Sequence, residues 1–135
     1  MLNQLNNQNL TKVTIMVNDA NSQSFYSLTF IQALVKQGHL TVVNLRASHR
    51  LQDLGWDTDI LKDFILALNE SHFVAKYPQC NCGSRNIDCD GYKMRFDEDE
   101  RIEDKRDGLE LFIKLAVSNR SKTLIVSFHT DGSPG

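Results

Sequence analysis

The side chains best suited to chemistry in this 135-residue sequence are lysines, arginines, tyrosines and one histidine in its second half. Lys76 stands beside Tyr77, and His129 directly follows an apolar run that ends at Phe128. A lysine ammonium can stabilise an anionic phosphoryl oxygen, and a histidine side chain can take or give a proton near neutral pH. These residue types favour acid–base chemistry on an anionic substrate over chemistry at a carboxylate-bound metal ion.

A short stretch that alternates polar and apolar residues predicts a strand with two different faces. Its period of two places Lys93 and Arg95 on one face and Tyr92 on the other. If the basic face lines a cleft, these two cations join Lys114 as phosphate contacts, and Tyr77 can stack on an unpaired base. The alternative is that the three cations lie on a solvated outer face, with Tyr92 packed in the core.

The three cysteines, Cys80, Cys82 and Cys89, lie within one ten-residue segment. An odd number of closely spaced cysteines is a poor disulfide framework, so we expect reduced thiols. Zinc is the alternative, with His72 as a fourth ligand. The acidic run over 97–107 lacks the spacing of a calcium-binding loop. We therefore expect no metal and no cofactor.

Composition and charge describe an ordinary globular chain. The hydrophobic content is 41% and the net charge is −2, so any RNA site has to be a local basic patch. No apolar window approaches ~20 residues, and the first ten residues lack the features of a secretory signal. We expect a cytoplasmic protein without a membrane partner, made of a frayed arm over 1–10 and a single domain over 11–135.

Helices are predicted in the first half of the chain. Apolar residues recur at steps of three and four from Asn21 up to Gly38, where the helix should stop. A short β-branched strand or an extended connection over 39–43 follows, and then a helix that ends at Gly55. Capping oxygens at 57–59 begin the next helix, which has one apolar stripe up to Leu68.

Strands are predicted in the second half, where the period of apolar residues changes to two. The expected segments are an extended run over 73–77 ended by Pro78, a strand over 90–96, a charged loop over 97–108, and strands over 109–117 and 123–129 that pair antiparallel. Helices first and strands last predict an α+β domain, with N-terminal helices packed on one face of a C-terminal antiparallel sheet.

Four segments in the same order are similar to those of a known toxin family. They are Leu34 to Gly38, the LxxLGWDxD run from Leu51 to Asp59, the ALNESHF run from Ala67 to Phe73, and LIVSF from Leu124 to Phe128. Together they resemble MqsR-family toxins over residues 25–130. The resemblance implies a RelE-like fold, ribosome-independent and metal-independent cleavage of single-stranded mRNA at selected sequences, and neutralisation by a cognate antitoxin protein.

The resemblance also implies positions for catalytic residues. The family's lysine after the helix-to-strand corner falls on Lys76, or on Ala75 if the match shifts by one residue. The family's glutamine, tyrosine and final lysine fall on Cys89, Phe112 and His129. A histidine at the last position can still do acid–base work. With Tyr92 and Lys114 added from the predicted strands, the candidate catalytic residues are Lys76, Tyr92, Lys114 and His129. The candidate RNA-binding residues are Tyr77, Lys93 and Arg95.

Two other functions stay open at this point. Because Cys89, Phe112 and His129 differ from the family's residues, the chain can instead be a catalytically inactive module that binds RNA or protein. A third interpretation is an interaction domain that zinc stabilises through the cysteines. An adjacent antitoxin-like reading frame would favour the toxin.

Overall fold

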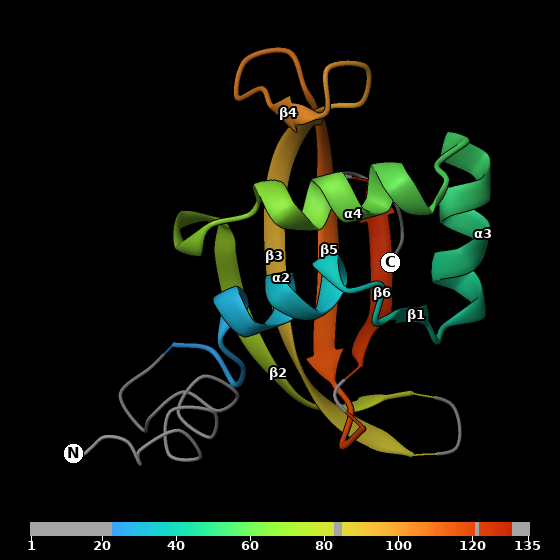
Figure 1. Ribbon diagram of the computed structural model, residues 1–135, viewed down its shortest axis with the longest axis vertical. Coiled ribbons are helices and arrows are strands. Elements are labelled where there is room, and N and C mark those ends of the chain that lie inside the picture. Colours follow the sequence, from blue (N-terminus) through green and yellow to red (C-terminus); the bar gives the residue numbers. More distant parts are fainter. Residues whose placement is uncertain (1–22, 83–84, 121, 131–135) are drawn as a thin grey trace.

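The structure is a computed structural model that describes residues 23–82, 85–120 and 122–130, and Figure 1 shows its arrangement. The arm predicted over 1–10 lies outside the described residues. Within them, no helix is long and apolar enough to cross a lipid bilayer. The helices, in chain order, are α2 (Leu28–Lys36), α3 (Leu45–Leu54), α4 (Thr58–Ala67) and a single 3-10 turn, η1 (Glu70–His72).

Each α-helix begins at a polar side chain that accepts a hydrogen bond from the first turn. The N-caps are Ser27, Asn44 and Asp57. Gly38 and Gly55 follow α2 and α3 with φ angles of 84° and 73°, which glycine adopts without the steric cost of a Cβ. The helix ends predicted at these glycines and the capping predicted at Asp57 are confirmed.

A six-stranded sheet forms the other layer. Its main path has the order β1-β6-β5-β3-β2, and β4 pairs with β3. The antiparallel pairing predicted for the last two long strands is confirmed. The strands are β1 (Leu40–Val42), β2 (Phe73–Asn81), β3 (Asn86–Asp97), β4 (Ile102–Glu103), β5 (Leu109–Val117) and β6 (Thr123–Thr130).

The α+β class is confirmed, but the expected order of helices before an antiparallel sheet is wrong. The short strand predicted near 39–43 is present as β1, between α2 and α3 in the chain. It joins the same sheet and pairs parallel with β6, with Leu40 opposite Thr123 and Val42 opposite Ile125. The sheet is therefore mixed. A strand of three residues has too little pattern to specify its partner, and only the return of the chain as β6 decides the direction of pairing.

The expectation that Pro78 ends its strand is also wrong. The strand β2 continues to Asn81, with a register shift between Tyr77 and Cys80 and a positive φ of 55° at Gln79. Because β2 is the last strand in the sheet order, the missing N–H of a proline is tolerated there. The charged loop expected over 97–108 likewise contains the short strand β4.

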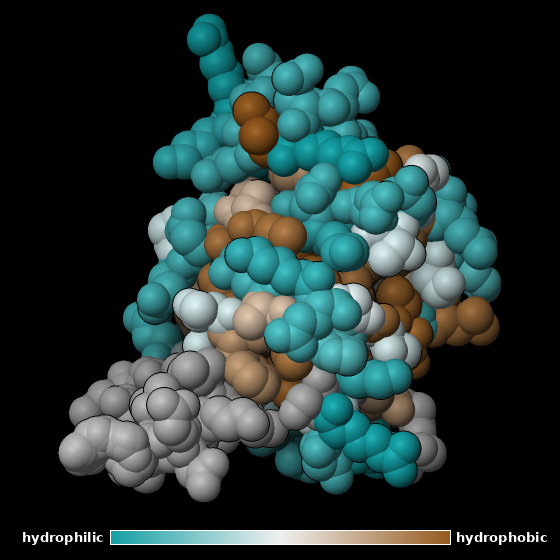
Figure 2. Space-filling model, viewed as in Figure 1, coloured by the Kyte–Doolittle hydropathy of each residue, from teal (hydrophilic) through white to brown (hydrophobic). Residues whose placement is uncertain are grey.

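The core lies between the sheet and the helices α2 and α4, which cross one face of it in Figure 1. Trp56, Phe64, Phe96 and Phe128 form an aromatic cluster with ring centroids 5.3–6.1 Å apart. The Trp56 indole donates a hydrogen bond of 2.5 Å to Glu98 at the rim. On the helix side, Figure 2 shows mainly hydrophilic side chains over the helices, with hydrophobic ones between them.

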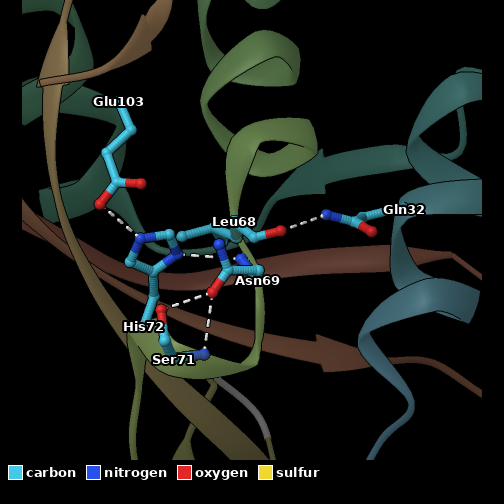
Figure 3. Close-up of polar contacts among 6 residues, drawn as sticks. All are labelled: Gln32, Leu68, Asn69, Ser71, His72 and Glu103. Atoms are coloured by element: carbon cyan, nitrogen blue, oxygen red, sulfur yellow. Dashed lines mark hydrogen bonds and ion pairs between the residues drawn. The ribbon is translucent and has the colours of Figure 1, made fainter.

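Polar contacts hold the corner between α4 and β2 (Figure 3). The Gln32 amide donates a hydrogen bond of 2.8 Å to the Leu68 carbonyl. Nδ1 of His72 accepts from the Asn69 N–H at 2.9 Å, and its Nε2 lies 2.8 Å from a carboxylate oxygen of Glu103. Because Nδ1 accepts, Nε2 carries the proton of the neutral ring and donates to Glu103. His72 is thus buried and paired at the end of η1.

Candidate functional site

The face of the sheet opposite α2 and α4 carries most of the predicted site residues. Leu111 and Ile113 of β5 point into the helix-covered core, so Phe112 and Lys114 point the other way. Phe112 is paired with Lys93 on β3 and with His129 on β6, which places all three side chains on the same face. We call this the basic face.

An aromatic row crosses the basic face. The rings of Tyr77 and Phe112 meet edge to face with centroids 6.0 Å apart, and the His129 ring lies 4.9 Å from Phe112 at an angle of 36°. The Lys114 ammonium stands 4.3 Å from the centroid of the Tyr77 ring, within the range of a cation–π contact. The row therefore connects Lys114 at one end with His129 at the other.

A groove of about 650 Å³ opens beside this row, between α3 and the strands β5 and β6. Lys114 and His129 line it from the sheet, and Arg46 and Arg50 line it from α3. We call it the α3–β6 groove. Four of its lining side chains are basic or can become cationic, and Leu45 at its rim is 72% exposed. The groove suits an anionic ligand that also has apolar surface.

The backbone orients the imidazole of His129. Its Nδ1 lies 3.3 Å from the carbonyl oxygen of Thr130, and a carbonyl can only accept a hydrogen bond. Nδ1 is therefore the protonated nitrogen of the neutral ring, and Nε2 carries the lone pair. Among the described residues, none forms a hydrogen bond with Nε2 of His129. This tautomer can take a proton from a substrate at Nε2.

Lys76 and Tyr92 lie on the other face and are not part of this site. Lys76 pairs with Asp90, and its ammonium stands 5.0 Å from the Phe25 ring. Tyr92 is 2% exposed in the helix-covered core, and burial raises the pKa of its hydroxyl. The structure thus brings together only Lys114 and His129 of the four candidate catalytic residues.

The candidate RNA-binding residues do share the basic face. Lys93 and Arg95 are exposed while Tyr92 is buried, so the predicted division of this strand into two faces is confirmed. Arg95 is paired across the sheet with Glu110, whose opposite charge weakens its attraction for a phosphate. Lys93, opposite Phe112, is therefore better placed than Arg95 to contact a phosphate.

The three cysteines are free thiols. Cys80 lines the α3–β6 groove, whereas Cys89 is fully buried and burial raises the pKa of its thiol. Cys89 therefore stays protonated and unreactive near neutral pH. Among the described residues, no group of three or more histidine, cysteine or acidic side chains is placed to hold a metal ion.

Sequence reasoning missed Arg46, Arg50 and Gly91. The two arginines are four residues apart and so share one face of α3, a spacing that could have marked them as a pair. A Cβ on Gly91 would lie only 2.5 Å from the Tyr77 ring and 3.0 Å from the Phe112 ring. Gly91 thus leaves space for both rings, and nothing in the sequence around it indicated this.

No protein-family model matches this chain, and no curated protein sequence matches it.

Proposed function

We propose that this chain is a metal-independent endoribonuclease that cuts single-stranded mRNA in the α3–β6 groove. The observation that carries the proposal is that the half-buried side chains of Lys114 and His129 line one groove together with Arg46 and Arg50. A proton acceptor beside several cations is what cleavage of RNA without a metal requires. The resemblance to MqsR-family toxins extends the proposal to a RelE-like toxin that a cognate antitoxin inhibits.

In the proposed reaction, Nε2 of His129 takes the proton of a ribose 2′-hydroxyl, and the 2′-oxygen attacks the adjacent phosphorus. The bond from phosphorus to the 5′-oxygen breaks, and the leaving oxygen takes a proton from water. The products are a 2′,3′-cyclic phosphate and a 5′-hydroxyl. Lys114, with Arg46 and Arg50, stabilises the negative charge that develops on the phosphoryl oxygens.

The test is to incubate the purified full-length chain with single-stranded RNA in excess chelator and to analyse the product ends. We expect cleavage that leaves 2′,3′-cyclic phosphates, and we expect the His129→Ala protein to lose it. Cleavage that needs added magnesium, or that leaves 3′-hydroxyl ends, would contradict this mechanism.

A second candidate function is RNA binding without cleavage. It is favoured by Phe112, whose apolar ring occupies the centre of the basic face where the family resemblance implies a tyrosine. Aromatic rings beside cations bind single strands by stacking and phosphate contacts alone. This function predicts that the protein retains an RNA oligonucleotide but leaves it intact under every ionic condition of the cleavage test.

A further inference from the structure

The Tyr77 ring holds a cation where the proposed function needs one. A lysine side chain has a flexible four-carbon stem, so an unrestrained ammonium occupies many positions. The Lys114 ammonium instead lies 4.3 Å from the centroid of the Tyr77 ring. Tyr77 is half-buried and meets Phe112 edge to face, so the ring that attracts the ammonium is itself held in place.

Gly91 makes this arrangement possible. Opposite Lys114, it lies on β3, an interior strand of the sheet between β5 and β2. A Cβ at this position would lie 2.5 Å from Cε2 of Tyr77, closer than van der Waals contact allows. The ring can therefore lie across the strand and contact both Phe112 and Lys114 only because residue 91 has no side chain.

We propose that Tyr77 is a positioning residue, whose ring holds the Lys114 ammonium at the α3–β6 groove, rather than a platform for an RNA base. A base that stacked on this ring face would have to displace the ammonium that lies over it. The inference rests on the proposed ribonuclease function for its catalytic consequence, whereas the contact between the ring and the ammonium can be tested without RNA.

The kinetic test compares Tyr77→Leu with Tyr77→Phe. A cation–π contact of this kind corresponds to about a tenfold effect, so Tyr77→Leu should lower kcat about tenfold and leave KM unchanged. Tyr77→Phe keeps the ring and should cleave like the wild type. Phe25→Leu is the matched control, because it removes the ring beside Lys76 on the other face and should change neither constant.

The spectroscopic test uses the NMR signals of the Lys114 side-chain methylene protons, which the ring current of Tyr77 shifts. We expect this shift to persist in Tyr77→Phe and to disappear in Tyr77→Leu, and Gly91→Ala should reduce it by displacing the ring. Lys114 signals that stay the same in Tyr77→Leu would overturn the proposal. A raised KM with unchanged kcat would also overturn it, because Tyr77 would then bind RNA directly.

The two tests separate this inference from the proposed function. If the wild-type chain does not cleave RNA, the proposed function fails, and the Lys114 signals still decide whether Tyr77 holds the ammonium. If the chain cleaves RNA and Tyr77→Leu leaves kcat and the Lys114 signals unchanged, the proposed function stands and the positioning role is wrong.

Discussion

His129 is the residue on which the proposed chemistry depends. Its ring is fixed on one side by Phe112 and at Nδ1 by the carbonyl of Thr130. In many enzymes a carboxylate sets the tautomer of a catalytic histidine, and here a backbone carbonyl does the same. The orientation of the ring therefore follows from the backbone of β6 and from Phe112 of β5, and it needs no acidic partner.

Replacing His129 with alanine should lower the rate of RNA cleavage on the order of 10²-fold or more, since a general base typically contributes about 10² to 10⁴. The loss should appear in single-turnover measurements, which report the chemical step.

The control for this prediction is His39→Ala, which removes an exposed histidine from the connection between α2 and β1. It should cleave RNA like the wild type. Equal rates for His129→Ala and the wild type would mean that His129 is only a structural residue of the basic face.

At the scale of elements, the segment just before α2 is attached to β3 by a buried carboxylate. Asp90 is fully buried, and its two oxygens accept hydrogen bonds from the N–H groups of Phe25 and Tyr26 at 2.8 and 2.9 Å. Burial raises the pKa of Asp90, and these two hydrogen bonds oppose that shift. The Tyr26 hydroxyl donates to the Asp88 carbonyl at 2.7 Å, which makes a third link between the segments.

Tyr26→Phe should change how stability depends on alkaline pH. Burial, more than the neighbouring charges, raises the pKa of Tyr26 from 10.0 to about 12. The folded chain thus holds this proton more tightly than the unfolded chain does. The stability that the protonated Tyr26 hydroxyl contributes is fully present below pH 10 and is lost as the pH rises through 12.

The measurement is the free energy of unfolding in urea, for the wild type and for Tyr26→Phe, at several pH values across this range. The wild type should be the more stable protein at pH 9, and its advantage should shrink as the pH rises. A difference that stays constant up to pH 12 would show that Tyr26 ionises equally in both states.

At the scale of the whole molecule, charge is distributed unevenly. The chain has a net charge of −2, yet Arg46, Arg50 and Lys114 line one groove. Many of the acidic residues lie instead on the connection from β3 to β5. On this connection, Arg101 forms an ion pair with Asp63 of α4 at 3.2 Å. A chain with no excess of positive charge can therefore still present a local basic patch to an RNA backbone.

This distribution predicts a specific dependence of RNA binding on salt. Three cations on phosphates should make the affinity for a 2′-O-methyl oligonucleotide, which cannot be cleaved, fall with a log–log slope of about −2. Lys114→Gln should reduce the slope by about 0.7. Lys36→Gln, at the exposed end of α2, is the control and should leave it unchanged. Fluorescence anisotropy over a salt series measures the slope, and equal slopes for Lys114→Gln and the wild type would exclude Lys114 from phosphate binding.

The sequence alone determined the elements whose signals are local. Capping side chains, apolar stripes and terminal glycines placed α2, α3 and α4, and an apolar run between turn residues predicted the observed bounds of β5. The same local geometry separated Lys93 and Arg95 from Tyr92, because successive residues of a strand point to opposite faces wherever the strand lies. The parallel pairing of β1 and the passage of β2 through Pro78 have no local signal, since both depend on which strand lies alongside.

Only the tertiary structure decided the membership of the candidate site. Tyr77 and Lys76 are neighbours in the chain, but the pairing of β2 with β3 puts Tyr77 beside Lys114 and puts Lys76 on the helix-covered face. Arg46 joins the groove because α3 packs against β6, which begins almost seventy residues after α3 ends. The physical reason is that a strand pattern states which residues share a face, whereas pairing and packing with distant segments decide what that face meets.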